Sequence, residues 1–160
     1  MSNVTIRRAR PGEATLVMSF IRELAEYEKL LHEVEATEAD IRRDLFGENP
    51  RSFCEVAEHN GEPVGFALWF YNYSTFRGRA GIYLEDLFVR PEARGLGAGK
   101  ALLRRLAQRC VDADLGRLEW AVLDWNTPSI EFYDSLGADR KDDWTVRRLD
   151  GEALERLAAS

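Results

Sequence analysis

Stretches in which hydrophobic and polar residues alternate divide this chain into predicted strands. Alternation is typical of a strand that buries one face, and residues 4–10 show it near the start. Residues 64–71 are instead apolar throughout except for Gly65, which indicates a strand buried on both faces. Asn60 and Gly61 lie just before that run and form a strong hairpin signal. The predicted strands cover residues 4–10, 52–58, 63–73, 82–89, 117–124 and 144–149.

Between these strands, hydrophobic residues recur every three or four positions, as they do along one face of a helix. Pro11 is suited to the first turn of a helix, and Thr37 with Asp40 resembles a capping box. Gly116 and Gly137 follow the last periodic positions of two later helices and are predicted to end them. The predicted helices cover residues 11–27, 37–46, 126–136 and 152–158, with another between the glycines at 95–99 and Gly116.

The order of these elements, β-α-α-β-β-β-α-β-α-β, predicts a single α/β domain over residues 1–160. Three consecutive strands predict an antiparallel run, and the β-α-β unit after it predicts a parallel, right-handed crossover. The expected result is a mixed, mostly antiparallel central sheet flanked by helices, with a ligand at the carboxyl ends of the strands. A length of 160 residues with 45% hydrophobic and 31% charged residues is typical of one globular domain.

Composition narrows the class of function. The formal net charge of −6 argues against a general nucleic-acid binder and suits a cationic small substrate. No run approaches the ~18 apolar residues of a membrane span, and the first residues lack a signal-peptide core. Cys54 and Cys110 each lie in an apolar pattern, which favours two buried free thiols over a disulfide. We therefore expect a cytoplasmic protein that binds neither nucleic acid nor membrane.

Residues 84–100, L-E-D-L-F-V-R-P-E-A-R-G-L-G-A-G-K, run from a predicted strand into a helix. The glycines let the backbone turn sharply, and the unpaired N–H groups at the helix start suit a phosphate or pyrophosphate. The spacing differs from the G-x-G-x-x-G of dinucleotide-binding proteins and from a P-loop, because Lys100 is followed by Ala101. R-x-x-G-x-G after V-R-P-E instead resembles the pyrophosphate loop of the GCN5-related N-acetyltransferases. An ordinary glycine-rich turn is the alternative.

Glu85 and Asp86 are consecutive acids in an otherwise apolar strand, so they are expected to point to opposite faces of the sheet. A buried carboxylate costs several kcal/mol unless it is paired or hydrogen-bonded, so its presence calls for an explanation. The functional interpretation is that these acids hold or deprotonate an amine in the cofactor cleft. The structural interpretation is an ion pair with one of the many arginines.

A second cluster, A-V-L-D-W-N-T-P-S-I-E-F-Y-D-S-L-G-A, covers residues 121–138. Asn126 stands where a helix cap belongs. Phe132 and Tyr133 are adjacent on the predicted helix, so one faces the core and the other points elsewhere. A phenol near the cofactor could protonate a leaving thiolate, whereas a packed aromatic is the structural alternative. His32 and His59 have no Cys or second His at metal spacing, so no metal site is expected.

Together these segments resemble the diamine acetyltransferases, the spermidine/spermine and thialysine branch of the GCN5-related N-acetyltransferase (GNAT) superfamily. The similarity covers nearly the whole chain. R-x-x-G-x-G marks only the superfamily, whereas Y-L-E-D with W-N-x-P-S-I-x-F-Y is much more specific. L-D-W-N, residues 123–126, is closer to the thialysine type, and the segment between Gly137 and Trp144 is shorter than in the polyamine enzymes.

The resemblance implies a GNAT fold, acetyl-CoA as cosubstrate, and a homodimer in which residue sharing between subunits is open. It implies Tyr133 as general acid. It implies amine contacts from Tyr27, Glu28 and Glu85 and from an acid just before Trp144. We take this acid as Asp143, with Asp142 as the alternative. Asp86, the second acid of the strand, is added to the predicted amine contacts. The implied cofactor contacts are Leu87, Phe88, Val89, Arg94, Gly95, Leu96, Gly97, Ala98, Gly99, Lys100, Asn126, Ser129 and Tyr133.

The expected reaction is acetyl transfer to the primary amine of a small polyamine, diamine or thialysine-like substrate by direct attack. An alkyl amine has a pKa near ~10.4 and is mostly charged at neutral pH, so Glu85, directly or through a water, is expected to take its proton. Backbone N–H near Val89 would polarise the carbonyl, and Tyr133 would serve the leaving sulfur. A protein-lysine or peptide acetyltransferase of the same fold and a non-catalytic CoA-binding sensor are the alternatives.

Overall fold

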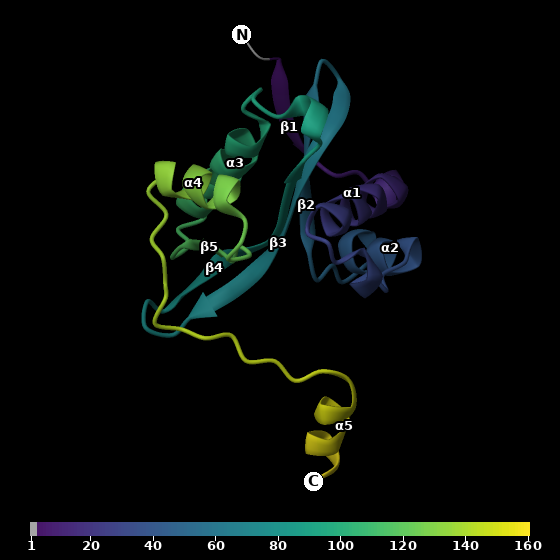
Figure 1. Ribbon diagram of the computed structural model, residues 1–160, viewed down its shortest axis with the longest axis vertical. Coiled ribbons are helices and arrows are strands. Elements are labelled where there is room, and N and C mark those ends of the chain that lie inside the picture. Colours follow the sequence, from purple (N-terminus) through teal and green to yellow (C-terminus); the bar gives the residue numbers. More distant parts are fainter. Residues whose placement is uncertain (1–2) are drawn as a thin grey trace. The chain divides into compact units, whose positions relative to one another are not determined.

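The computed structural model describes residues 3–160, so the first two residues of the predicted 1–160 domain lie outside it (Figure 1). The described chain forms two compact units, one up to Ala121 and one from Val122 to Ser160. The strands are β1 (Val4–Arg8), β2 (Phe53–His59), β3 (Glu62–Ser74), β4 (Arg79–Val89) and β5 (Leu118–Trp120). The helices are α1 (Ala14–Tyr27), α2 (Glu38–Phe46), α3 (Ala98–Asp112), α4 (Thr127–Ser135) and α5 (Gly151–Ala159), and short 3-10 turns cover Pro11–Glu13, Leu31–Glu33 and Pro91–Ala93.

The first unit is built on one sheet with the strand order β1-β2-β3-β4-β5. The first three pairings are antiparallel, and β4 pairs with β5 in parallel after the crossover through α3. The hairpin between β2 and β3 turns at Asn60 and Gly61, which both have positive φ (52° and 83°). The predicted α/β fold, a mixed and mostly antiparallel sheet flanked by helices, is therefore confirmed.

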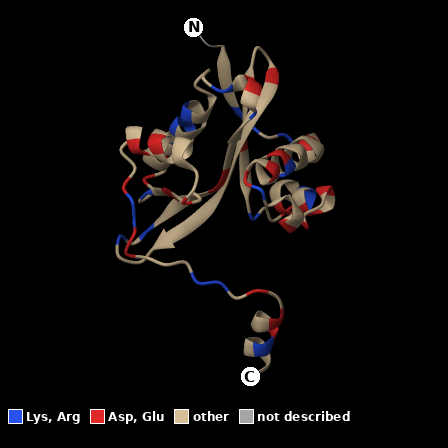
Figure 2. Ribbon diagram, viewed as in Figure 1, with Lys and Arg blue, Asp and Glu red and all other residues tan. Residues whose placement is uncertain are grey.

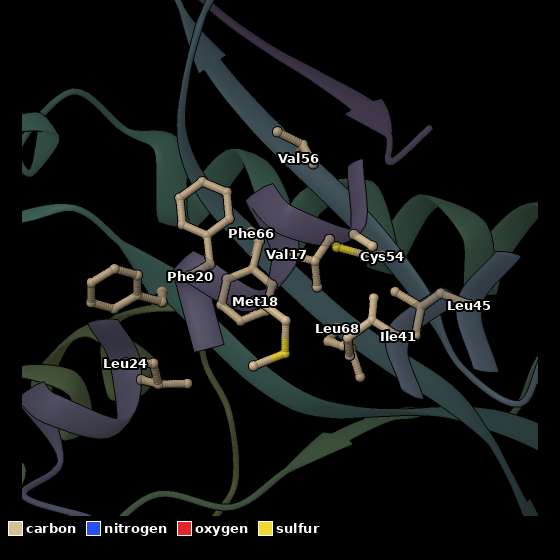
Figure 3. Packing of buried hydrophobic residues seen from close by; sticks show 12 residues of the cluster. Val17, Met18, Phe20, Leu24, Ile41, Leu45, Cys54, Val56, Phe66 and Leu68 are labelled. Atoms are coloured by element: carbon tan, nitrogen blue, oxygen red, sulfur yellow. The ribbon is translucent and has the colours of Figure 1, made fainter. Parts of the chain in front are cut away.

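Helices α1 and α2 cover one face of this sheet (Figure 1). Their apolar stripes meet the strand residues that point to that face, and the rings of Phe20 and Phe66 stack with centroids 5.3 Å apart (Figure 3). The periodicity of α1 predicted this packing, because its buried residues recur at helical spacing. The main buried cluster consists of Ala14, Val17, Met18, Phe20, Leu24, Ile41, Leu45, Cys54, Val56, Phe66, Leu68 and Phe88.

Helix α3 covers the opposite face, where Leu102 and Leu106 are fully buried (Figure 1). This face also holds Glu55, a carboxylate with no exposed surface. It accepts hydrogen bonds from Arg109 Nε (3.0 Å) and Trp69 Nε1 (3.1 Å). Because a buried charge is tolerated only when it is paired, this network ties α3 to the sheet. No sequence pattern singled out Glu55.

A β-bulge interrupts the pairing of β3 with β4. Leu68 lies opposite Asp86 and Trp69 lies opposite Leu84, so Glu85 is the extra residue and has no partner on β3. Cross-strand partners share a face, so the bulge places Leu84 on the α3 face with Trp69 and Asp86 on the α1 face with Leu68. Without the extra residue, Leu84 and Asp86 would lie on the same face.

Most predicted helix ends are confirmed. Thr37 and Asp40 form the predicted capping box, with Thr37 N–H donating to Asp40 Oδ2 at 2.8 Å. The expectation that Gly116 ends α3 is wrong: the helix stops at Asp112, and Asp114 takes the left-handed conformation (φ 53°). Leu115 N–H then donates to Cys110 O at 2.8 Å, which completes a helix-ending motif. Aspartate is one of the few non-glycine residues that adopts this conformation readily.

The strand predictions hold less well toward the C-terminus. Strand β5 covers only Leu118–Trp120 of the predicted 117–124. Residues 144–149, predicted as a strand, form none, and Trp144 and Val146 are 82% and 81% exposed. Their alternating pattern permits an extended chain, but a strand forms only beside another strand, and none lies within residues 122–160. The second unit therefore consists of α4, an extended segment and α5.

Cys54 and Cys110 are buried free thiols, as predicted, and burial raises the pKa of both. No helix within residues 3–160 combines the length and the hydrophobicity needed to cross a membrane. No group of His, Cys, Asp and Glu side chains in the same range is arranged to hold a metal ion.

Candidate active site

The glycine-rich segment forms a cradle of backbone N–H groups at the start of α3. Gly95 and Gly97 both have φ of +84°, which only glycine adopts without strain, and a Cβ at either position would meet no atom within 4 Å. Among the described residues, the N–H groups of 95–100 have no hydrogen-bond acceptor, and the first that has one is Ala101, to Gly97 O at 2.9 Å. Gly99 lies inside α3, so two of the three glycines make the turn.

This cradle fits a pyrophosphate. Unpaired N–H groups at a helix start attract an anion, and the positive end of the helix dipole adds to that attraction. Lys100, Arg104 and Arg105 follow on α3, which Figure 2 shows as a helix rich in basic positions. The open space beside Gly95 and Gly97 leaves room for the ligand to reach the backbone. The segment therefore has the features that the diphosphate of acetyl-CoA requires.

The edge of β4 beyond the bulge is open to a ligand within the first unit. Strand β5 pairs only with Ile82–Leu84, whereas β3 pairs along β4 as far as Val89. The backbone of residues 85–89 that faces away from β3 therefore has no strand beside it. Leu87, Phe88 and Val89, the predicted cofactor contacts, lie in this open stretch. A ligand with amide groups could continue the sheet here, which is a known mode of binding to strand edges.

The burial of the two acidic residues of β4, Glu85 and Asp86, differs from what the sequence predicted. Glu85, expected to be a buried carboxylate, is exposed, because the bulge releases it from the ladder. Asp86 is half-buried on the α1 face, and burial raises the pKa of its carboxyl to about 7, with further contributions from the charges of Glu85 and Glu28. Burial also raises the pKa of Glu28. We call Glu28, Glu85 and Asp86 the acidic cluster.

No described cationic side chain forms an ion pair or hydrogen bond with a member of the acidic cluster. The structural interpretation of Glu85 and Asp86, an ion pair with a buried arginine, is therefore wrong. The carboxylate that has that structural role is Glu55, on the opposite face. The carboxyl groups of the acidic cluster thus remain available to a cation from outside the protein.

Tyr27 and Glu28 close helix α1 beside the glycine-rich segment. Tyr27 is the last residue of α1, Glu28 is its C-cap, and Lys29 turns the chain with a φ of 62°. The guanidinium of Arg94, just before Gly95, lies 4.9 Å from the centre of the Tyr27 ring. The structure therefore brings the predicted amine contacts Tyr27, Glu28, Glu85 and Asp86 to one region of the first unit. This region lies next to the glycine-rich segment that is predicted to bind the cofactor.

The second unit holds the remaining predicted residues. Asn126 is buried and caps α4, its side-chain oxygen accepting from the N–H of Ser129 at 3.4 Å. Tyr133 is half-buried, and its ring centroid lies 5.5 Å from that of Phe132. Gly137 (φ 81°) ends α4, as predicted. Asp142 pairs with Arg140 at 3.2 Å, and Asp143 is exposed.

No sequence pattern pointed to two side chains near the glycine-rich segment, Arg90 and Glu23. Arg90 follows β4 directly and pairs with Glu23 of α1, with Nε to Oε1 at 3.1 Å. The spacing of charges along a sequence does not reveal this pair, because its members are separated by 67 positions.

Comparison with known proteins defines the family. Residues 18–138 match the Acetyltransferase (GNAT) family, so the chain belongs to it. The chain is 42% identical to the thialysine N-epsilon-acetyltransferase of Bos taurus, with 99% of both chains covered. It is 34% identical to the human spermidine/spermine N(1)-acetyltransferase-like protein 1, over 99% of this chain and 24% of that protein. The resemblance predicted from the motifs, to the diamine acetyltransferase branch, is confirmed.

Solved structures support the fold. An integron cassette protein from the mobile metagenome of V. cholerae aligns with a TM-score of 0.81 at 29% identity, with 99% of both chains covered. An aminoglycoside acetyltransferase from a soil metagenome aligns with a TM-score of 0.77 over 92% of this chain. The sequence identity is 15%, so this likeness is evidence for the fold alone.

Proposed function

We propose that this protein transfers the acetyl group of acetyl-CoA to the primary amine of a small polyamine, diamine or thialysine-like substrate. The observation that carries the proposal is the acidic cluster, which has no cationic partner among the described residues and lies in the same region as Tyr27 and the N–H cradle. Membership of the GNAT family and the names of the full-length relatives support the same chemistry. Residues 1–160 are proposed to work as one N-acetyltransferase domain.

The cofactor residues are proposed from the cradle and the open strand edge. When bound, acetyl-CoA supplies an acetyl group activated as a thioester. The N–H groups of residues 95–100 bind its diphosphate, and the backbone at Leu87, Phe88 and Val89 binds the pantetheine arm along the edge of β4. The N–H near Val89 polarises the thioester carbonyl, and Asn126 and Ser129 add contacts from the second unit.

The acidic cluster is proposed to hold and deprotonate the amine. Carboxylates attract the alkylammonium ion, and Tyr27 and Asp143 complete its surroundings. Because the charged amine has no free electron pair, a base must take its proton before attack, and Glu85 does so directly or through a water. The exposure of Glu85 suits this role, since an exposed carboxylate can exchange its proton with solvent afterwards.

Tyr133 is proposed as the general acid. Tyr133 is half-buried, and its hydroxyl would donate a proton to the thiolate that leaves when the amine attacks the acetyl carbon. The C–S bond breaks and the C–N bond forms. The amine nitrogen gives up two protons: Glu85 accepts the first before attack, and the second leaves as the C–N bond forms and restores the Tyr133 hydroxyl, which has given its own proton to the sulfur. Glu85 then releases its proton to solvent.

Assembly and location are part of the proposal. A homodimer is favoured because Trp144, Val146, Leu154 and Leu157 of the second unit are all more than half exposed, an unusual display of large apolar side chains. A cytoplasmic location is favoured by two free thiols, which persist in reducing compartments.

The test is release of free thiol from acetyl-CoA in the presence of polyamines, diamines, lysine and thialysine, with a lysine-containing peptide beside them. Turnover on a small amine and none on the peptide supports the proposal. Turnover only on the peptide would make the protein a lysine acetyltransferase, and CoA binding without any turnover would make it a sensor.

A further inference from the structure

Arg90 connects three elements at the point where β4 leads into the cofactor loop. Its Nε and Nη2 donate to both carboxylate oxygens of Glu23 on α1, at 3.1 Å in the closest contacts. Its Nη1 donates to the carbonyl of Pro63 at the start of β3, at 3.2 Å. The guanidinium also lies 4.7 Å from the ring centre of Phe20. Each nitrogen of the guanidinium therefore has an acceptor within the protein.

A second arginine holds the other end of the same short segment. The segment from Arg90 to Arg94 contains the 3-10 turn Pro91–Ala93 and ends directly before Gly95. Arg94 Nε donates to Val89 O at 3.2 Å, and its guanidinium lies over Tyr27. Glu23 and Tyr27 are four positions apart on α1, so they lie on one side of the helix. Two residues on one side of α1, Glu23 and Tyr27, thus contact Arg90 and Arg94, the two ends of the segment that leads to the N–H cradle.

We propose that Arg90 and Glu23 are positioning residues that fix the N–H cradle for acetyl-CoA without touching the cofactor. The cradle turns at two left-handed glycines, and such a backbone is flexible unless its flanks are held. A ligand binds more weakly when binding must also order the loop. It binds more tightly when neighbouring residues already hold the loop in the binding conformation. This inference rests on the proposed use of acetyl-CoA.

The experiment measures the Kd of CoA, which needs no turnover, by calorimetry over a range of salt concentrations. Arg90→Met keeps the aliphatic stem on Phe20 and removes the bonds to Glu23 and Pro63. Its Kd is expected to rise about tenfold, the cost of ordering one or two residues on binding. The salt dependence of binding should stay that of wild type, since no contact between a charge and a phosphate is lost.

Two further variants separate positioning from general loss of stability. Glu23→Gln keeps the shape of the side chain and should weaken CoA binding in the same direction but less, while the double variant should bind no worse than Arg90→Met. Arg7→Met is the matched control, because Arg7 is also half-buried and pairs with Glu13 and Glu58, but on edge strand β1. It should lower Tm and leave the Kd of CoA unchanged.

A folded Arg90→Met protein with wild-type Kd would overturn the inference, and so would an equal loss of affinity in Arg7→Met. A shallower salt dependence in Arg90→Met would also overturn it, because Arg90 would then contact a phosphate directly. Should Arg90→Met not fold, unchanged affinity in Glu23→Gln would decide against the inference. Failure of wild type to bind CoA would instead overturn the proposed function, and this inference with it.

Discussion

Asp86 lies directly opposite Leu68 in the sheet, on the apolar face that α1 covers. A carboxyl among hydrophobic side chains and beside two other acids holds its proton more tightly than in water, and its pKa is about 7. The bulge at Glu85 creates this arrangement, because it turns Asp86 to the α1 face and leaves Glu85 exposed. Two adjacent acids of the same strand therefore differ in environment, and we expect them to differ in behaviour.

The raised pKa of Asp86 predicts a pH dependence of stability. The folded state binds this proton more tightly than the unfolded chain, in which an aspartate has a pKa of ~3.9. Stability from the protonated form is therefore fully present below about pH 4 and is lost as pH rises through about 7. The side chain of Asp86→Asn stays neutral at every pH. The Tm of this variant minus that of wild type should therefore increase between about pH 4 and about pH 7 and stay constant above about pH 7. A constant difference in Tm from pH 4 to pH 8 would contradict the assignment.

Replacement of Gly97 by aspartate tests the cofactor cradle. The new side chain meets no protein atom within 4 Å, and aspartate tolerates a φ of +84° better than most residues, so the fold should survive with a loss of about 1 kcal/mol. Its carboxylate would occupy the space proposed for the diphosphate and repel it, and CoA binding in calorimetry should become undetectable. Gly137→Asp, at a left-handed glycine of α4, is the matched control and should bind normally.

Tyr133→Phe removes one hydroxyl and keeps the ring packed beside Phe132. Loss of a general acid lowers the rate by a factor of ~10²–10⁴, and kcat should fall within that range while the Kd of CoA changes little. A kcat within a few-fold of wild type would exclude Tyr133 as the acid or show that another step limits turnover. A burst of product in pre-steady-state kinetics distinguishes these two outcomes.

Glu55 and Glu85 form a natural comparison between a structural and a functional carboxylate. Glu55→Ala would strand Arg109 and the Trp69 N–H, and we expect a loss of about 3 kcal/mol in the free energy of unfolding. Glu85→Ala removes an exposed side chain without a cationic partner and should change that free energy by less than about 0.5 kcal/mol. Urea denaturation measures both. Equal losses would mean that Glu85 has a structural contact that its exposure does not show.

Local patterns predicted most of the elements, because each element is encoded by neighbours in sequence. The period of α1, the capping box at Thr37 and the hairpin at Asn60 all depend on residues within a few positions of one another. The glycine-rich cradle was predictable for the same reason.

What the sequence did not reveal depends on contacts between distant segments. The bulge arises from how β4 aligns with β3, and nothing in L-E-D-L marks Glu85 as the extra residue. The pairs Glu55–Arg109 and Glu23–Arg90 join residues 54 and 67 positions apart. Residues 144–149 have a strand pattern but no strand beside them within their unit. A pattern predicts what a segment can form, whereas its partners decide whether it does.

The central claim is that the acidic cluster takes a proton from an alkylammonium substrate, and Glu85→Gln tests it most directly. The amide fills the same space, so Tm should match wild type while kcat/KM for the amine falls and the KM for acetyl-CoA stays the same. Between about pH 7 and pH 10 a growing share of the amine arrives already deprotonated, so the deficit in kcat/KM should shrink as pH rises. The measurement is a pair of kcat/KM profiles over that range, with melting curves beside them. A slow variant whose deficit is the same at every pH would contradict the role of Glu85 as base, and a large drop in Tm with near-normal kinetics would return Glu85 to a structural role.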